Sequence, residues 1–262
     1  MEYREYLAEF IGMFILILLG SGASAIYIYE AHGPTFPLDL ACTSWGLAIM
    51  VSVYINDGVS GGHNSPAVTL AFACWRGFPW RKVPGYWFAQ NFGAFCATGI
   101  LYLMYKADLD LAFSLGHQTP MESYLIAAPF FTSPDPIRGN YLCFLSEAIS
   151  TAAMLIFIFA CIDRYNVPPV HCAPVAMGLA ISGILAAFGS SGSVSLNPAR
   201  DFGPRLLMFA AGYGKILFTA NDGYAWVPVV APFIGAVAGG VIYDIFIATG
   251  PDPEDKYDSR RF

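Results

Sequence analysis

Charge is scarce in this chain. Only 12% of its 262 residues are charged, whereas 56% are hydrophobic and 16% aromatic, and a typical soluble domain carries about 25% charged residues. A chain with so little charge and a mean hydropathy of +0.54 does not fit one or two soluble domains. The net charge of −6 comes without a basic cluster, so nucleic acid is not an expected partner.

Clusters of chemically reactive side chains are missing as well. The cysteines have no CxxC or metal-ligand spacing, and we interpret them as small buried hydrophobic residues; they are Cys42, Cys74, Cys96, Cys143, Cys161 and Cys172. Histidine, aspartate and glutamate do not gather at one depth of the apolar segments, as a membrane enzyme would require. We therefore expect no metal, no cofactor and no enzymatic activity.

Long apolar runs are abundant, and a bilayer-spanning helix needs roughly 20 mainly apolar residues. The sequence predicts six spans, at about 6–28, 38–55, 83–105, 141–161, 173–188 and 226–248. Basic residues are more frequent in the segments that lie on the side of the N-terminus, which predicts that both termini are cytoplasmic. We expect an integral protein of the plasma membrane.

The two halves of the sequence resemble each other. Glu9 lies near the start of the first span and Glu147 in the fourth, and each half continues to a Pro-Ala motif, Ser65-Pro66-Ala67 and Asn197-Pro198-Ala199. Because each half holds three spans, the second copy must be inverted relative to the first, as in many transport proteins. We predict one domain over 1–262, with repeats at about 6–107 and 141–249 and a connecting loop at 108–140.

The repeated motifs read as helix starts, with a capping side chain followed by proline. The segments 67–75 and 199–211 are too short to span, so each is predicted to be a half-helix that begins in the interior. Two helix N-termini meeting near the midplane would repel cations, while carbonyl groups of 61–64 and 193–196 would offer acceptors to a neutral solute.

Glu9 and Glu147 are ionisable residues in apolar spans, and such residues are candidates for function. No nucleophile or metal ligand accompanies them, so we expect their carboxylates to accept hydrogen bonds from the re-entrant backbone. A channel is the favoured function. A secondary transporter, which would use an ionisable residue to bind a coupling ion, and a membrane enzyme are the alternatives.

These motifs, with Ala8-Glu9-Phe10-Ile11-Gly12, Ser60-Gly61-Gly62-His63 and Asn197-Pro198-Ala199-Arg200, resemble the major intrinsic proteins, or aquaporins. The resemblance implies an all-α membrane fold of six transmembrane helices and two re-entrant half-helices, and a homotetramer with one pore per subunit. Asp201 and Arg205 resemble the glycerol-conducting branch. That branch implies glycerol and water as solutes and a selectivity filter that contains Trp45 and Arg200.

The sequence departs from the family pattern in two places. Ser65 replaces the first asparagine, and although its hydroxyl can cap the half-helix and face the pore, it reaches less far; the neighbouring Asn64 could compensate or could bond loop backbone. Val194 stands where the branch usually has phenylalanine, and either Leu185 or Gly183 supplies the filter residue of the fifth span. His63 is expected on the cytoplasmic side of the pore. Urea, hydrogen peroxide and metalloid acids remain alternative solutes.

Overall fold

The computed structural model describes residues 3–29, 37–116, 119–134, 137, 139–163, 165–166, 172–189 and 194–248. The first repeat contains α1 (Tyr3–Tyr29), α2 (Leu38–Ser60), α3 (Pro66–Trp75), the 3-10 turn η1 (Trp80–Lys82) and α4 (Val83–Met104). The connection contains α5 (Lys106–Gly116), α6 (Pro120–Ala127) and the 3-10 turn η2 (Ala128–Phe130). The second repeat contains α7 (Gly139–Ile162), α8 (Ala173–Phe188), α9 (Pro198–Met208), the π-turn η5 (Phe209–Tyr213), α10 (Ile216–Gly223), the 3-10 turn η6 (Tyr224–Trp226) and α11 (Val227–Phe246).

Six helices form the spanning bundle. Within the described ranges, four stretches could cross a membrane by length and composition alone: Tyr3–Ile26, Leu38–Ser60, Gly139–Ile162 and Ile216–Phe246. The 22-residue α4 and the 16-residue α8 complete the six. At about 1.5 Å per residue, α8 is shorter than the roughly 30 Å hydrocarbon core. With α3 and α9, of 10 and 11 residues, the predicted fold of six spans and two half-helices is confirmed.

The second span is longer than predicted. The sequence predicts an end at Ile55, because Asn56-Asp57-Gly58 resembles a turn. The helix continues to Ser60 and ends at Gly61, whose left-handed backbone (φ 83°) lets its N–H donate to the Asp57 carbonyl. The Asn56 side chain is fully buried and hydrogen-bonded, so its tertiary contacts override the local turn signal.

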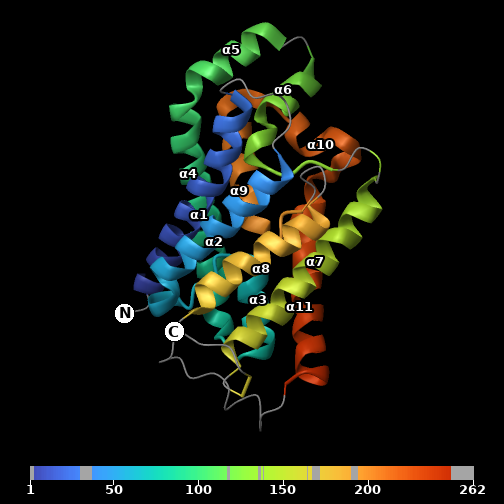
Figure 1. Ribbon diagram of the computed structural model, residues 1–262. Coiled ribbons are helices and arrows are strands. Elements are labelled where there is room, and N and C mark those ends of the chain that lie inside the picture. The colour runs from blue at the N-terminus through green and yellow to red at the C-terminus, as the bar shows by residue number, and fades with distance from the viewer. Residues whose placement is uncertain are drawn as a thin grey trace.

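The connection between the repeats is largely helical. We expected a connecting loop at 108–140, and α5 and α6 occupy much of it. Thr119 and Glu122 form a reciprocal capping box that begins α6 ahead of Pro120, a strong local start signal. This segment lies at the upper end of the bundle with α10 (Figure 1).

Helix packing follows the inverted repeat. α1 packs against α2 and α4, α7 packs in the same way against α8 and α11, and the middle helices α2 and α8 pack against each other. Each half-helix packs against the last span of the opposite repeat, α3 on α11 and α9 on α4. In Figure 1, α3 lies in the lower half of the bundle and α9 in the upper half. The predicted inversion of the second repeat is therefore confirmed.

The two repeats contact each other through the backbones of two glycines where α2 crosses α8. A Cβ atom on Gly46 would lie 2.5 Å from the Gly178 carbonyl oxygen, and one on Gly178 would lie 2.7 Å from the Gly46 carbonyl oxygen. Nearby, the Ser182 hydroxyl donates to the Cys42 carbonyl at 3.0 Å. Small residues at helix crossings allow such close approach in membranes, which holds the two halves in register around the interior.

The interpretation of the cysteines as buried residues is only partly correct. Cys42, Cys143 and Cys161 are buried and Cys96 is intermediate, but Cys74 and Cys172 are exposed on the surface of the bundle. In a membrane protein the outer surface is itself apolar, so a hydrophobic context in the sequence does not distinguish the interior from the lipid-facing side.

Candidate pore and filter site

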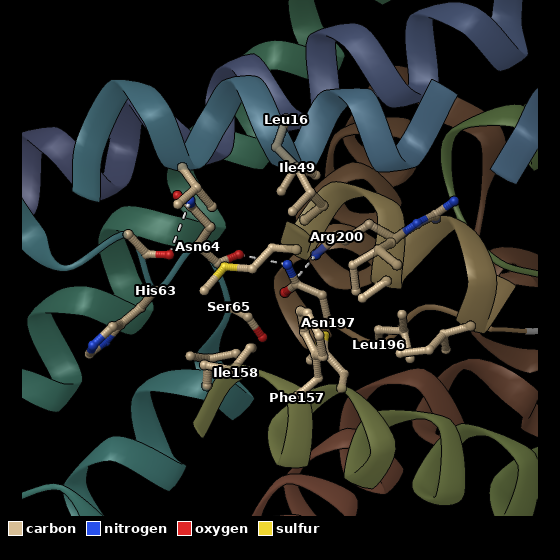
Figure 2. A pocket seen from close by; sticks show the side chains of 18 of the residues that line it. Leu16, Ile49, His63, Asn64, Ser65, Phe157, Ile158, Leu196, Asn197 and Arg200 are labelled. Atoms are coloured by element: carbon tan, nitrogen blue, oxygen red, sulfur yellow. Dashed lines mark hydrogen bonds between the residues drawn. The ribbon is translucent and has the colours of Figure 1, made fainter. Parts of the chain in front are cut away.

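A cavity passes between the two half-helices. Its lining comes from α1, α2, α3, α7, α8, α9 and the segments that precede the half-helices. The predicted residues that line it are Trp45, His63, Asn64, Ser65, Leu185, Val194, Asn197 and Arg200. Figure 2 shows Asn64, Ser65 and Asn197 together in the middle, with His63 toward one end and Arg200 toward the other. Of the two candidates on α8, Leu185 lines the cavity, whereas Gly183 is exposed.

Both half-helices begin at this cavity with a capped first turn. The Ser65 hydroxyl accepts a hydrogen bond from the Ala67 N–H at 3.2 Å. The Asn197 side-chain oxygen accepts from the N–H groups of Ala199 at 3.0 Å and Arg200 at 3.4 Å. Pro66 and Pro198 are the first helical residues, and Ala67 and Ala199 are fully buried. The remaining dipole of each half-helix points its positive end into the cavity.

Glu9 ties the first re-entrant segment to α1. One carboxylate oxygen accepts from the Ser60 hydroxyl at 2.6 Å and the His63 N–H at 3.0 Å. The other accepts from the Asn64 N–H at 2.8 Å and the Gln90 side-chain amide at 2.6 Å. Four donors compensate the loss of water around this fully buried group, which would otherwise be costly in the membrane.

Glu147 ties the second re-entrant segment to α7 in the same way. Its two oxygens accept from the consecutive N–H groups of Ser195 at 2.7 Å and Leu196 at 2.5 Å. Leu196 has a φ of 60°, which is a strained, left-handed conformation for a bulky residue. The carboxylate therefore stabilises the backbone turn that delivers Asn197 to the cavity.

Asn64 does not take the place of the missing family asparagine. Its side-chain amide donates to the Asn56 side-chain oxygen at 3.2 Å and accepts from the Asn56 amide at 2.7 Å, and it also donates to the Gly62 carbonyl at 3.3 Å. Its own carbonyl accepts from the Asn197 amide at 2.6 Å (Figure 2). Asn64 thus supplies a backbone acceptor at the centre while its side chain points into the protein.

Arg200 lies in the first turn of α9, and its guanidinium covers the Trp45 ring at 4.3 Å from the ring centroid. This is a cation–π geometry between α9 and α2. The buried Nη1 of Arg200 finds no hydrogen-bond acceptor among the described residues. A buried donor without an acceptor is unusual, and it belongs to a residue that lines the cavity.

His63 is buried at the opposite end of the cavity. Its Nδ1 lies 3.2 Å from the Thr69 hydroxyl. Its ring packs 4.5 Å from Phe72, 4.8 Å from Phe78 and 5.2 Å from Tyr86, measured between centroids. These aromatic neighbours confine the imidazole, so it contributes a fixed wall rather than a mobile side chain.

Asp201 supports the outer segments and does not line the cavity. It accepts from the Thr132 N–H at 2.8 Å and hydroxyl at 2.6 Å, and from Arg205 at 2.8 and 3.0 Å. Arg205 also donates to the carbonyl groups of Thr132 and Leu217 and covers the Phe131 ring at 4.2 Å. This buried pair joins α9 to the segment after η2 and to α10.

A second buried ion pair holds the far end of α3. Arg76 directly follows α3 and is only 3% exposed. It makes two hydrogen bonds to Asp244 of α11, at 2.9 and 2.7 Å, and covers the Phe159 ring at 3.8 Å. The bidentate pair fixes the half-helix against the opposite repeat.

Several supporting residues were missed in the sequence analysis. Asn56, Gln90 and Thr132 hold the loops around the cavity through side-chain hydrogen bonds. Asn56 and Gln90 are polar residues inside apolar spans, and that position is itself a signal of function or structural support.

Taken together, the inverted repeat, the two half-helices and the cavity between their N-termini define a class: integral membrane proteins with a pore inside each chain. In the part of the chain that the structure describes, no group of three or more His, Cys, Asp or Glu side chains could hold a metal ion. The site is built from the two helix caps, backbone groups and the Arg200 side chain, and these suit the passage of a solute.

Comparison with known proteins identifies the family. The family model described as major intrinsic protein matches residues 1–243, and the chain belongs to that family. It is 39% identical over 258 residues to aquaporin-6 of Laccaria bicolor, a match that covers 95% of this chain and 81% of that protein. It is 40% identical over 252 residues to aquaglyceroporin-9 of Botryotinia fuckeliana, covering 95% of this chain and 55% of that protein.

A solved structure has the same fold. The aquaglyceroporin from Plasmodium falciparum superposes with a TM-score of 0.81 at 32% identity, and the match covers 94% of this chain and 97% of that one. The likeness therefore includes both repeats and both half-helices rather than one part of the bundle.

Proposed function

We propose that this chain is a passive transmembrane channel for small uncharged solutes, chiefly glycerol and water. The observation that carries the proposal is the meeting of two capped half-helix N-termini, at Ser65 and Asn197, in a single lined cavity. Relatives named aquaporin and aquaglyceroporin support it. Two positive dipole ends repel cations at this point, whereas a neutral dipolar molecule can exchange hydrogen bonds with the surrounding groups.

The proposed selectivity filter consists of Trp45, Leu185, Val194 and Arg200. Arg200 supplies hydrogen-bond donors and a permanent positive charge, and the other three side chains are apolar or aromatic. A solute with hydroxyl groups along one edge and carbon-bound hydrogens along the other matches this combination, and glycerol is such a solute. Urea, hydrogen peroxide and metalloid acids are also neutral and small, and they are tested beside it.

A coupled transporter is less well supported. Its best candidates for a coupling-ion site are Glu9 and Glu147, and both already accept hydrogen bonds from the re-entrant backbone. A carboxylate engaged in holding a strained loop would have to release that loop in each transport cycle. No enzymatic activity is part of the proposal.

The proposal extends to assembly and location: a homotetramer in the plasma membrane, with both termini cytoplasmic. An even number of spans returns the chain to its starting side. In Figure 1 the first turn of α1 and the last turn of α11 accordingly lie at the same, lower end of the bundle. The excess of Lys and Arg in the segments on that side supports the cytoplasmic orientation.

Stopped-flow light scattering on proteoliposomes tests the function, with water, glycerol and urea gradients compared side by side. We expect water and glycerol to equilibrate faster than in protein-free liposomes, with glycerol flux that rises linearly with the gradient and does not depend on ions. Saturating flux that requires an ion gradient would establish a transporter instead. Rates equal to those of protein-free liposomes would reject both.

A further inference from the structure

The two re-entrant segments match in the residue that directly precedes each cap, since Asn64 and Leu196 both have a left-handed backbone, but they differ at the cap itself. An offset of 132 residues pairs Asn64 with Leu196 and Ser65 with Asn197, and both segments are tied to a buried glutamate through consecutive N–H groups. Asn197 caps its own half-helix and also reaches across to the Asn64 carbonyl at 2.6 Å. Ser65 caps its half-helix but has no amide with which to return that contact.

The first re-entrant segment instead has a side-chain contact with α2, in its own repeat. The side-chain amides of Asn56 and Asn64 form a reciprocal pair at 2.7 and 3.2 Å. Asn56 also donates to the Ala8 carbonyl at 3.2 Å, so the pair connects the re-entrant segment to α2 and α1. The positions that the offset pairs with these asparagines hold Phe188 and Leu196, which cannot form such a pair.

The surrounding helices leave space for this pair. Asn56 is 0% and Asn64 2% exposed. The nearest atoms to a Cβ built on Gly12 of α1 would be the Asn56 amide nitrogen and the Asn64 side-chain oxygen, so any larger residue would displace them. Buried amides must keep their partners, because an unpaired one carries its full desolvation cost. The pair is therefore a specific fit among α1, α2 and the loop.

We propose that the Asn56–Asn64 pair positions the first re-entrant segment. It takes the place of the hydrogen bond across the pore that Ser65 cannot make. It holds the Asn64 carbonyl where that carbonyl orients the Asn197 amide, and so it sets the discrimination among solutes at the pore centre. The inference rests on the proposed function, because it requires that solutes pass through the cavity. It predicts that substitutions at Asn56, Asn64 and Ser65 are energetically coupled.

The test is a mutant cycle in proteoliposomes. Asn64→Leu is made in the parent and in a Ser65→Asn background, where the new amide can reach toward the Leu196 carbonyl as Asn197 reaches toward Asn64. In the parent we expect Asn64→Leu to change the glycerol-to-water permeability ratio about fivefold, equivalent to about 1 kcal/mol, and in the Ser65→Asn background less than about twofold. Asn91→Leu is the matched control, since among the described residues the Asn91 side chain bonds only the Trp87 carbonyl of its own helix. Its effect should be equal in both backgrounds.

Equal effects of Asn64→Leu in the two backgrounds overturn the proposal. Asn56→Leu breaks the same pair from α2 and must show the same dependence on residue 65. The thermal unfolding midpoints of the same proteins in detergent give a second mutant cycle that does not depend on flux. We expect Asn64→Leu to lower the midpoint more when residue 65 is serine than when it is asparagine. If the parent conducts neither water nor glycerol, the proposed function fails; if it conducts and both cycles are additive, only this inference fails.

Discussion

Replacing Glu147 by glutamine tests whether this carboxylate holds the second re-entrant segment. The change is isosteric, yet glutamine has one acceptor oxygen where glutamate has two. The N–H groups of Ser195 and Leu196 each use a different oxygen, at 2.7 and 2.5 Å. In the variant one of them faces an NH2 group, and two donors then oppose each other in a fully buried site.

The expected loss combines two terms. One hydrogen bond to a charged group contributes about 1.5–3 kcal/mol, and a stranded buried donor costs about 1–3 kcal/mol. The sum is about 2.5–6 kcal/mol, which corresponds to a decrease on the order of 10 °C in the unfolding midpoint for a chain of this size. Because Leu196 is held in a strained conformation, the segment should also relax away from the cavity and reduce glycerol flux.

Thermal unfolding of the detergent-solubilised protein and glycerol flux in proteoliposomes measure the two effects. Glu5→Gln is the matched control, because Glu5 is 26% exposed and pairs with Lys82 at 2.7 Å, and such pairs near the surface contribute about 0–1 kcal/mol. If Glu147→Gln shifts the midpoint no more than Glu5→Gln does and leaves glycerol flux intact, the anchoring role is wrong.

Three further substitutions test other parts of the site. Arg200→Ala should widen the filter and remove its positive charge, so that cation leak rises in a fluorescence flux assay; unchanged flux and selectivity would count against its filter role. Trp45→Ala removes the aromatic surface under the Arg200 guanidinium and should lower the glycerol-to-water permeability ratio in stopped-flow measurements, and an unchanged ratio would remove Trp45 from the filter. Arg205→Met strands the fully buried Asp201 carboxylate and should cost about 3–5 kcal/mol in thermal unfolding, whereas Asp201→Leu combined with Arg205→Met should recover most of that loss; equal stability of the single and double variants would contradict a coupled pair.

Local signals were sufficient for the half-helices and the inverted repeat. Ser65-Pro66 and Asn197-Pro198 each combine a cap with a first-turn proline, and these depend on neighbouring residues only. The spans followed from apolar length, but their ends did not always: α2 continues past Ile55 because Asn56 is stabilised by partners in α1 and in the re-entrant segment. Such partners are distant in sequence, so no local pattern reports them.

The pairing of charged residues was also beyond the sequence. Arg76 reads as an interfacial cation because it follows a short apolar segment and precedes a glycine. Its partner Asp244 is 168 positions away, and only the packing of α3 against α11 brings the two together.

The sequence by itself determined that the chain lies in a lipid bilayer, how many spans it has, that the second repeat is inverted and where the two half-helices begin. Apolar length and capping chemistry are properties of short segments, so they can be read locally. The tertiary structure alone decided where each polar side chain points. It turned Asn64 toward Asn56, left Ser65 at the cavity, brought Leu185 rather than Gly183 to the lining and set Arg200 over Trp45. These outcomes depend on which helices pack together, since a buried polar group in a membrane must find its partner wherever the fold provides one.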